Sequence, residues 1–292
     1  MLKLVNERVV GFSLDYLDVL WEIQPTSEDV QKYQFYVERS ESQAGPWDLI
    51  AGPLLDIYRV RDTSALQTSN LRKFFYRIRV VNMIRDVETI SAPFDREGGM
   101  DLIGAEIARN NEVVFREYTG VKCFVFPVRT FGQRCTQCWD ATLEQITNPR
   151  CPTCFRTGFV GGYHYPIKFW AQIDESDQTE QVSSALRTEV KLDALRLGVL
   201  PEIKPRDLIV DFKNRRFRVT KVGGTRRLGR KVHQEVHLSQ IEPGSIEHVI
   251  PIRVGDDELL KPARTFTNAH NMEAEIDHNS LDMASLRSLF RF

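Results

Sequence analysis

Four of the chain's five cysteines lie in the segment RCTQCWDATLEQITNPRCPTC, residues 134–154, as two C-x-x-C pairs. Twelve residues, 139–150, separate the pairs. A tight turn at each C-x-x-C points two thiolates at one centre, and a short hairpin can bring the four sulfurs together. The spacing therefore predicts a zinc ribbon that holds Zn²⁺ through Cys135, Cys138, Cys151 and Cys154. Because the protein would fill all four coordination positions, we expect a structural ion and not a catalytic one.

Two other uses of these cysteines stay open. A redox centre needs one C-x-x-C that follows a strand and opens a helix, and it would leave the second pair unexplained. Two disulfides are the alternative in an oxidised sample. Acidic residues such as Glu7 and Asp15 interrupt the N-terminal sequence, which therefore lacks the sections of a signal peptide. We expect the chain to fold in a reducing cytoplasm, which favours thiolates.

The fifth cysteine, Cys123, lies in the apolar stretch VKCFVFPV and is expected to be a buried small hydrophobe.

A second cluster with chemical potential is basic. Nine lysines or arginines fall within residues 213–231, and four of them crowd the loop GGTRRLGRK, namely Arg226, Arg227, Arg230 and Lys231. Such a loop can bind DNA phosphates without reading sequence, although a solvated hairpin is the alternative. The glycines at 224 and 229 imitate the spacing of a phosphate-binding loop, but Arg and Lys follow where that motif needs Lys and Ser or Thr. Nucleotide hydrolysis is therefore not expected.

Other catalytic patterns are missing from the sequence. There is no G-x-S-x-G and no H-E-x-x-H, and His233 and His237 fall in an expected strand, where a metal pair is not favoured. We therefore expect a protein that is not an enzyme.

The 292 residues are 42% hydrophobic and 27% charged with a formal net charge of -1, which indicates a soluble globular chain of two or three domains. No apolar run approaches a membrane span, so no membrane partner is expected, and any DNA contact must come from a local patch.

The elements that must position these residues are mainly strands. Alternation in YLDVLWEI, QKYQFYVERS and KFFYRIRVVN predicts a β-sandwich over residues 1–97. Apolar residues at helical spacing predict a linking helix over 98–120, followed by the ribbon over 121–165. Short strands with polar turns then predict a small β-barrel over 166–249, in which SSALRTEVKLDALRLGVL is undecided between helix and strand. Residues 250–292 have weak periodicity and are expected to form an extended arm.

The first part of the chain resembles a fibronectin type III domain. The resemblance rests on Trp21 in an early strand, on YVERS followed by Gly45-Pro46, and on YRIRVVN at residues 76–82. It implies a sandwich and no chemistry. We expect Trp21, Tyr36, Tyr76 and Ile78 to be committed to the sandwich's own core, and the sandwich to be a separable outer unit.

The ribbon and the barrel also carry a resemblance. The stretches GQRCTQCWD and CPTCFRTGFVGGYHYP look like the zinc-ribbon insert of neck proteins of tailed bacteriophages, and PRDLIVDF with RRFRV is similar to the barrel of head-closure and head-tail connector proteins. The resemblance implies a structural virion protein, made in the host cytoplasm and assembled as a homo-oligomeric ring in the neck. Its partners would be a portal or adaptor protein, tail terminator or sheath and tube proteins, and the backbone of packaged DNA in the lumen.

Two further functions stay open at this point. The fibronectin-like domain is also compatible with a baseplate or adhesion structural protein, in which the sandwich would meet a tail component or a host surface. The basic loop is the only support for a zinc-ribbon nucleic-acid-binding factor.

Overall fold

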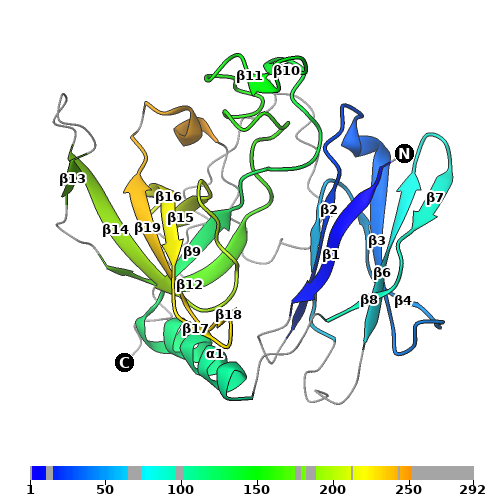
Figure 1. Ribbon diagram of the computed structural model, residues 1–292, viewed down its shortest axis with the longest axis horizontal. Helices are drawn as coiled ribbons and strands as arrows, with labels where there is room; N and C mark the ends of the chain where they lie inside the picture. The colour runs from blue at the N-terminus through cyan, green and yellow to red at the C-terminus, as the bar shows by residue number, and fades with distance from the viewer. Residues whose placement is uncertain are drawn as a thin grey trace, which may run out of the picture.

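The computed structural model describes residues 2–10, 16–64, 74–96, 102–174, 179–181, 189–211, 213–242 and 244–250. The fold is mainly β, with a β-barrel and one α-helix among the described residues, as the sequence predicted (Figure 1). The barrel is closed and has six strands. The expected arm lies outside the described residues beyond Ile250. In the described part of the chain, no helix combines the length and the apolar character needed to cross a membrane.

Two sheets form the N-terminal part and share one core. The first sheet has the order β1-β2-β5, with β1 (Leu4–Val10), β2 (Leu17–Ile23) and β5 (Arg59–Asp62). The second has the order β4-β3-β6-β7, with β4 (Asp48–Leu54), β3 (Tyr33–Ser40), β6 (Phe75–Asn82) and β7 (Val87–Ile90). Strand β8 (Phe94–Asp95) pairs with the start of β6, and a short 3₁₀ turn, η1 (Val30–Lys32), precedes β3.

Alternation along β3 and β6 separates the core from the outer face. Tyr76 and Ile78 are fully buried together with Trp21 from the facing sheet, as expected. Tyr36 was also expected in the core, but it lies outside it. Phe35 and Val37 occupy the core positions of β3 instead. The Tyr36 ring therefore lies on the outer face, where the guanidinium of an arginine on β6 stacks over it.

Six antiparallel strands close the barrel. Their order around it is β12 (Ile167–Asp174), β9 (Val121–Phe126), β15 (Leu208–Asp211), β16 (Arg216–Gly223), β19 (Gln234–Gln240) and β14 (Glu189–Leu197). Pairing of β14 with β12 closes the barrel. A further short strand, β13 (Thr179–Gln181), pairs with the first residues of β14 and is not one of the six barrel strands. Of the segment that was undecided between helix and strand, residues 183–188 lie outside the described residues, and Glu189–Leu197 form strand β14.

The barrel core contains the fifth cysteine. Cys123 is fully buried among residues such as Phe169, Ala171 and Phe217, which confirms its expected role. Burial raises the pKa of its thiol to about 12, so it stays protonated and unreactive. Because Cys123 belongs to β9, the barrel begins at Val121, earlier than the expected start at residue 166. The ribbon is consequently an insertion between two neighbouring barrel strands, β9 and β12.

A single helix links the two halves of the fold. Helix α1 (Leu102–Val114) continues into a π-helical turn, η3 (Phe115–Thr119), which confirms the predicted helix. Its small residues Gly104 and Ala108 are buried, whereas the predicted apolar positions Ile103 and Ile107 are exposed. The helical spacing left open whether these apolar residues form core or a contact surface, and in the structure Ile103 and Ile107 are exposed.

Candidate metal centre

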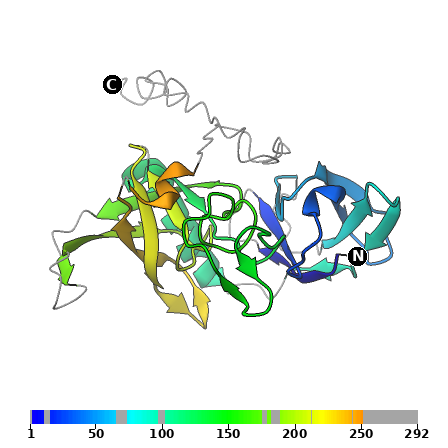
Figure 2. The same ribbon diagram turned by 90° about the horizontal axis from the view of Figure 1, so that it is seen from above.

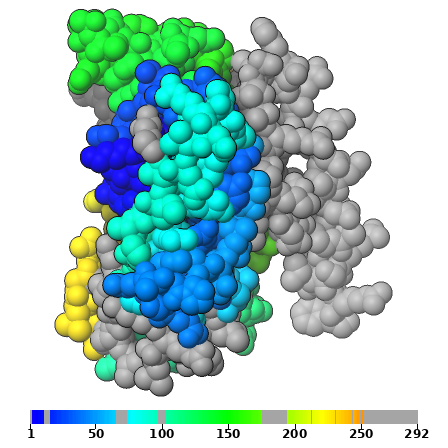
Figure 3. Space-filling view, turned by 90° about the vertical axis from the view of Figure 1, so that its right-hand side faces the viewer, coloured from blue at the N-terminus to red at the C-terminus, as the bar shows by residue number. Residues whose placement is uncertain are grey.

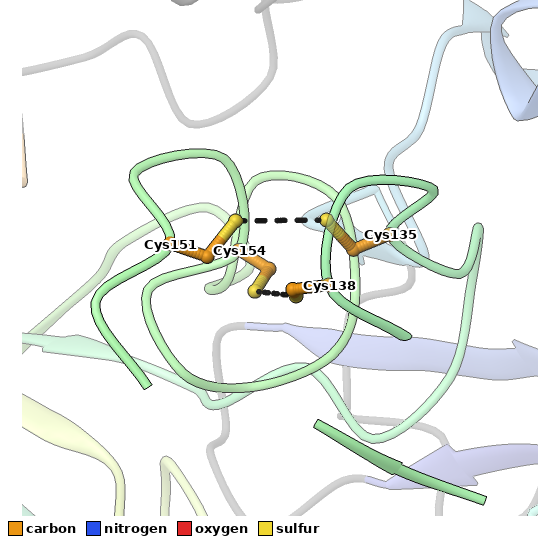
Figure 4. A group of neighbouring side chains, drawn as sticks. All are labelled: Cys135, Cys138, Cys151 and Cys154. Carbon is orange, nitrogen blue, oxygen red and sulfur yellow. Dashed lines mark hydrogen bonds between the residues drawn. The ribbon is translucent and has the colours of Figure 1, made fainter. Parts of the chain in front are cut away.

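The four cysteines gather in the loop that connects β9 to β12. A two-stranded hairpin of β10 (Trp139–Asp140) and β11 (Gln145–Ile146) separates the pairs, so that the second C-x-x-C folds back against the first (Figure 4). All four side chains are buried and form a cluster of their own. The sequence predicted this cluster, and the structure brings all four residues together.

Distances between the sulfurs fit a metal ion and exclude disulfides in this structure. The Sγ atoms of Cys135 and Cys151 are 3.8 Å apart, and those of Cys138 and Cys154 are 3.1 Å apart. Both distances far exceed the roughly 2.05 Å of a disulfide bond. Ligand atoms about 2.3 Å from a tetrahedral ion lie about 3.8 Å from one another. With all four sulfurs within 4.8 Å of one another, the site can hold one ion with a small adjustment.

Matching turns position the two pairs. The backbone N–H that follows the first pair, at Trp139, donates to the carbonyl of Cys135 at 3.1 Å. In the second pair Phe155 donates in the same way to Cys151 at 3.0 Å. Each pair is thus a closed turn that directs both of its thiols inward. The turns are tied together by Gln137, whose Oε1 accepts a hydrogen bond of 2.6 Å from the hydroxyl of Thr153.

A glycine is required beside the second turn. Gly162 has a φ of +69°, and a Cβ there would stand 2.8 Å from the Phe155 ring and 2.9 Å from the carbonyl oxygen of Cys154. Both approaches are closer than real Cβ atoms tolerate, and the left-handed backbone adds strain for other residues. The glycine-rich exit of the ribbon therefore serves close packing around the cysteines.

The protein environment shifts the pKa values of Cys138 and Cys151 in opposite directions. Burial raises the pKa of Cys138, and hydrogen bonds with neighbouring thiols raise it further. Burial also acts to raise the pKa of Cys151, but hydrogen bonds from backbone N–H groups and neighbouring thiols together outweigh it and lower that pKa to about 7. A divalent cation would favour the thiolate form at all four positions and displace their protons. Since every ligand comes from the protein, the arrangement can support a fold and leaves no coordination position for a substrate.

The ribbon is joined to the N-terminal sheets by a buried ion pair. The guanidinium of Arg129 contacts both carboxylate oxygens of Asp56, with Nη1 to Oδ1 at 2.9 Å and Nη2 to Oδ2 at 2.6 Å. Only 4% of the Arg129 side chain and 14% of the Asp56 side chain are exposed. The Nε of Arg129 also donates to the carbonyl of Tyr163. Bidentate pairing at this depth fixes the ribbon against the loop between β4 and β5.

Aromatic packing continues across the same junction. The ring of Tyr58 lies 5.0 Å from that of Phe131 and 5.7 Å from that of His164, both from the ribbon segment. Burial, Arg129 and a nearby lysine lower the pKa of His164 well below its usual value, so this ring is neutral. Every buried member of the sandwich core lies within residues 2–80, and Phe131 and Tyr165 from the ribbon segment pack against that core. The sandwich therefore has a core of its own, as expected, and its separability stays a prediction.

The predicted DNA-binding residues form one hairpin. Arg226 and Arg227 make up β17, and Arg230 and Lys231 make up β18, with Arg226 opposite Lys231 and Arg227 opposite Arg230. Arg226 is exposed and Arg227 is half-buried. The Nζ of Lys231 lies 3.7 Å from a carboxylate oxygen of Glu202, within reach of a weak ion pair. The structure brings the four residues together in one hairpin, and their contact with DNA stays a prediction.

Other members of the basic cluster have structural partners. Arg215 pairs with Asp211 at 2.7 Å, and the buried Arg216 donates to the carbonyl oxygens of residues 247, 248 and 250. Arg218 pairs with Glu247. Arg216 and Arg218 thus hold the 3₁₀ turn η4 (Ile246–Val249) against the barrel. These three arginines of the cluster therefore have structural roles, which separates them from the β17-β18 hairpin.

A cleft of about 870 Å³ separates the sheet β1-β2-β5 from the barrel. Arg8 and Lys231 approach it from opposite sides, and each lies 3.7 Å from Glu202. Sequence reasoning missed this cleft and the pair of Arg129 with Asp56. The partners are 73 positions apart in the chain, and no local pattern marks either of them.

No protein-family model matches the chain, and a comparison with curated proteins finds no significant match. The fold and the cysteine cluster are therefore the basis for a functional assignment.

Proposed function

We propose that the chain is a structural subunit of the neck of a tailed bacteriophage, assembled as a ring between portal and tail through which DNA passes. The observation that carries the proposal is the four-cysteine loop inserted between adjacent strands of a closed barrel. The stretches that are similar to head-closure and connector proteins fall on β15, which pairs with β9, and on β16, which pairs with β15. The two-sheet N-terminal part supports a fibronectin type III-like domain attached to it.

We further propose that the ion is Zn²⁺ in a structural role. Four thiolate ligands in a tetrahedron are the preferred environment of structural zinc. Among the described residues, the buried cluster of the four cysteines has one further hydrophobic side chain packed against it, that of Ile146. A unit of this kind derives much of its folding free energy from the metal. The ion would therefore hold the loop that carries Arg129, and through it the junction with the sandwich.

The β17-β18 hairpin is the proposed contact with DNA in the channel. Two arginines stand opposite an arginine and a lysine on a hairpin of four strand residues, so cationic side chains are concentrated there. Loops of this kind bind phosphates through charge and depend on salt concentration. The contact would hold packaged DNA without selecting a sequence.

Immunogold labelling of purified phage particles tests the proposed location. An antibody against the chain should label the joint between head and tail. Label at the tail tip would overturn the neck assignment in favour of a baseplate or adhesion protein, for which the N-terminal sheets are the supporting feature. A chain found in infected cells but absent from particles would favour a zinc-ribbon nucleic-acid-binding factor.

A further inference from the structure

The cleft between the sheet β1-β2-β5 and the barrel has the size of a ligand-binding site. Its volume of about 870 Å³ falls within the range of roughly 300–1,000 Å³ that is usual for small-molecule sites. Seen from above, the barrel and the N-terminal sheets stand side by side, and residues of both halves line the cleft (Figure 2). Neither half alone would therefore form it.

Four cationic side chains line the cleft around a single carboxylate. Glu202 lies 3.7 Å from Arg8 of β1 and 3.7 Å from Lys231 of the β17-β18 hairpin. Arg226 stands opposite Lys231 in that hairpin, and Lys204 follows Glu202 by two residues. Figure 3, which views the molecule from the side of the N-terminal sheets, shows a yellow segment of the barrel half close to the dark blue of β1. All five side chains belong to the lining, so this cationic cluster has a formal charge of +3.

Alternating burial directs Glu202 and Lys204 to the same side of their segment. Pro201 and Ile203 are buried, whereas Glu202 and Lys204 are exposed. The side chain of Gln234 fixes this pattern, because its Oε1 accepts a hydrogen bond of 3.1 Å from the N–H of Ile203 and its Nε2 donates to the carbonyl of Pro201 at 2.8 Å. Lys204 has no ion-pair partner among the described residues. Its ammonium group is therefore available to a ligand.

Several acidic residues that line the cleft are held by partners of their own. Asp18 pairs with two arginines of β5, at 2.5 Å and 3.1 Å. Asp56 is the bidentate partner of Arg129, and Asp207 accepts two hydrogen bonds of 2.8 Å from backbone N–H groups. These carboxylates are thus engaged elsewhere, and the excess positive charge around Glu202 favours an anionic ligand.

Six partly exposed aromatic rings also line the cleft, namely Tyr16, Phe115, Phe131, His164, Tyr165 and Trp170. The ring of His164 lies 4.6 Å from that of Phe131 and is tilted by 32° against it. After burial and Arg129, Lys204 is a further cause of the lowered pKa of His164, so this aromatic wall lies near the cationic cluster. Because planar rings stack on aromatic side chains, the wall suits a planar ligand.

We infer that this cleft binds a nucleoside phosphate, the class of ligand that joins a phosphate to a planar aromatic ring. The phosphate would contact Lys204 and the two hairpin cations, and the base would pack against the aromatic wall. A phosphate monoester carries roughly 1.5 to 2 negative charges at neutral pH and offers several acceptor oxygens, so it matches the charge of the cluster. The inference goes beyond the proposed neck function and does not rest on it, because the cleft lies within one chain.

Isothermal titration calorimetry of the full-length protein tests the inference. The probes are AMP, GMP, CMP and UMP, together with ribose 5-phosphate, which lacks the base, and the matching nucleosides, which lack the phosphate. At least one of the four monophosphates should bind with a Kd below about 1 mM. Its nucleoside and ribose 5-phosphate should each bind about tenfold more weakly or worse, because each loses one part of the recognition.

Two substitutions outside the β17-β18 hairpin place the ligand in the cleft. Lys204→Ala should weaken binding of the monophosphate by about tenfold, because a charge-assisted hydrogen bond is lost. Glu202→Gln should strengthen it, because a negative charge beside the phosphate is removed and Arg8 and Lys231 are released. The matched control is Lys221→Ala, at an exposed lysine of β16 outside the cleft lining, and it should leave binding unchanged. Circular dichroism checks that each variant is folded.

Four results would overturn the inference. It is wrong if none of the four monophosphates binds, if ribose 5-phosphate binds as tightly as the monophosphate, or if Lys204→Ala binds like the parent. Equal losses in Lys204→Ala and Lys221→Ala would also refute it, because they would show attraction by overall charge and not a site. The hairpin arginines are unchanged in these variants, so the proposed DNA contact and the neck assignment are tested separately.

Discussion

Replacing Asp56 by asparagine tests whether the ribbon and the N-terminal sheets are one cooperative unit. The side chain of Arg129 is 4% exposed, and Asp56 is its bidentate partner. Breaking a buried pair by removing one charge costs about 3–5 kcal/mol, because the other charge is left without compensation. Asparagine suits the position because Asp56 has a φ of 55°, a conformation that asparagine tolerates better than alanine. Since its amide oxygen still accepts one bond, we expect a loss of about 3 kcal/mol, at the low end of this range.

Urea unfolding of the full-length chain provides the assay. Fluorescence of the buried Trp21, in a background in which the other three tryptophans are replaced by phenylalanine, follows the sheets. Release of the metal to a chelating dye follows the ribbon. The two transitions should coincide in the parent and shift together in Asp56→Asn. The matched control is Glu117→Gln, whose partner Arg116 is 43% exposed, and there a change of less than about 1 kcal/mol is expected. The double variant Asp56→Asn with Arg129→Met should regain much of the loss, because no buried charge remains. A loss below about 1 kcal/mol in Asp56→Asn, or separate transitions in the parent, would refute the reasoning.

Three further predictions concern the metal, the pH dependence and the basic hairpin. Cys151→Ser should lose the ion and unfold the ribbon locally, and elemental analysis that still finds one zinc per chain would contradict this. Burial raises the pKa of Asp207 from 3.8 to about 6, so its contribution to stability is present below pH 3.8 and is lost as the pH rises through about 6. In urea unfolding, Asp207→Asn should therefore lose less stability than the parent over that interval, and parallel pH profiles would refute the assignment. Alanine at Arg226, Arg227 and Arg230 should lower the slope of log affinity for DNA against log salt by about 3, and an unchanged slope in fluorescence anisotropy would exclude the hairpin from the contact.

Local patterns were sufficient for several parts of this structure. The C-x-x-C spacing located all four cysteines of the cluster, because both turns are determined by neighbouring residues. Alternation identified the buried side of β6, with Tyr76 and Ile78 in the core. The burial of Cys123 followed from its apolar neighbours. In each case the residues that decide the local structure lie close to one another in the sequence.

Long-range contacts account for what the sequence did not reveal. The start of the barrel at Val121 depends on pairing of β9 with β12 and β15, across the whole ribbon insertion. The apolar spacing of α1 does not say which side is buried, and the structure buries Gly104 and Ala108 and exposes Ile103. The pair of Arg129 with Asp56 joins two segments that carry no matching pattern. Periodicity identifies an element, but the surface that it meets is set by the fold.

X-ray absorption at the zinc edge of the full-length protein, purified under reducing conditions, tests the central claim most directly. That claim is a closed structural centre made by Cys135, Cys138, Cys151 and Cys154. The account predicts zinc with a single shell of four sulfur atoms at about 2.3 Å. A shell that includes oxygen or nitrogen, or protein that carries no zinc, would contradict it.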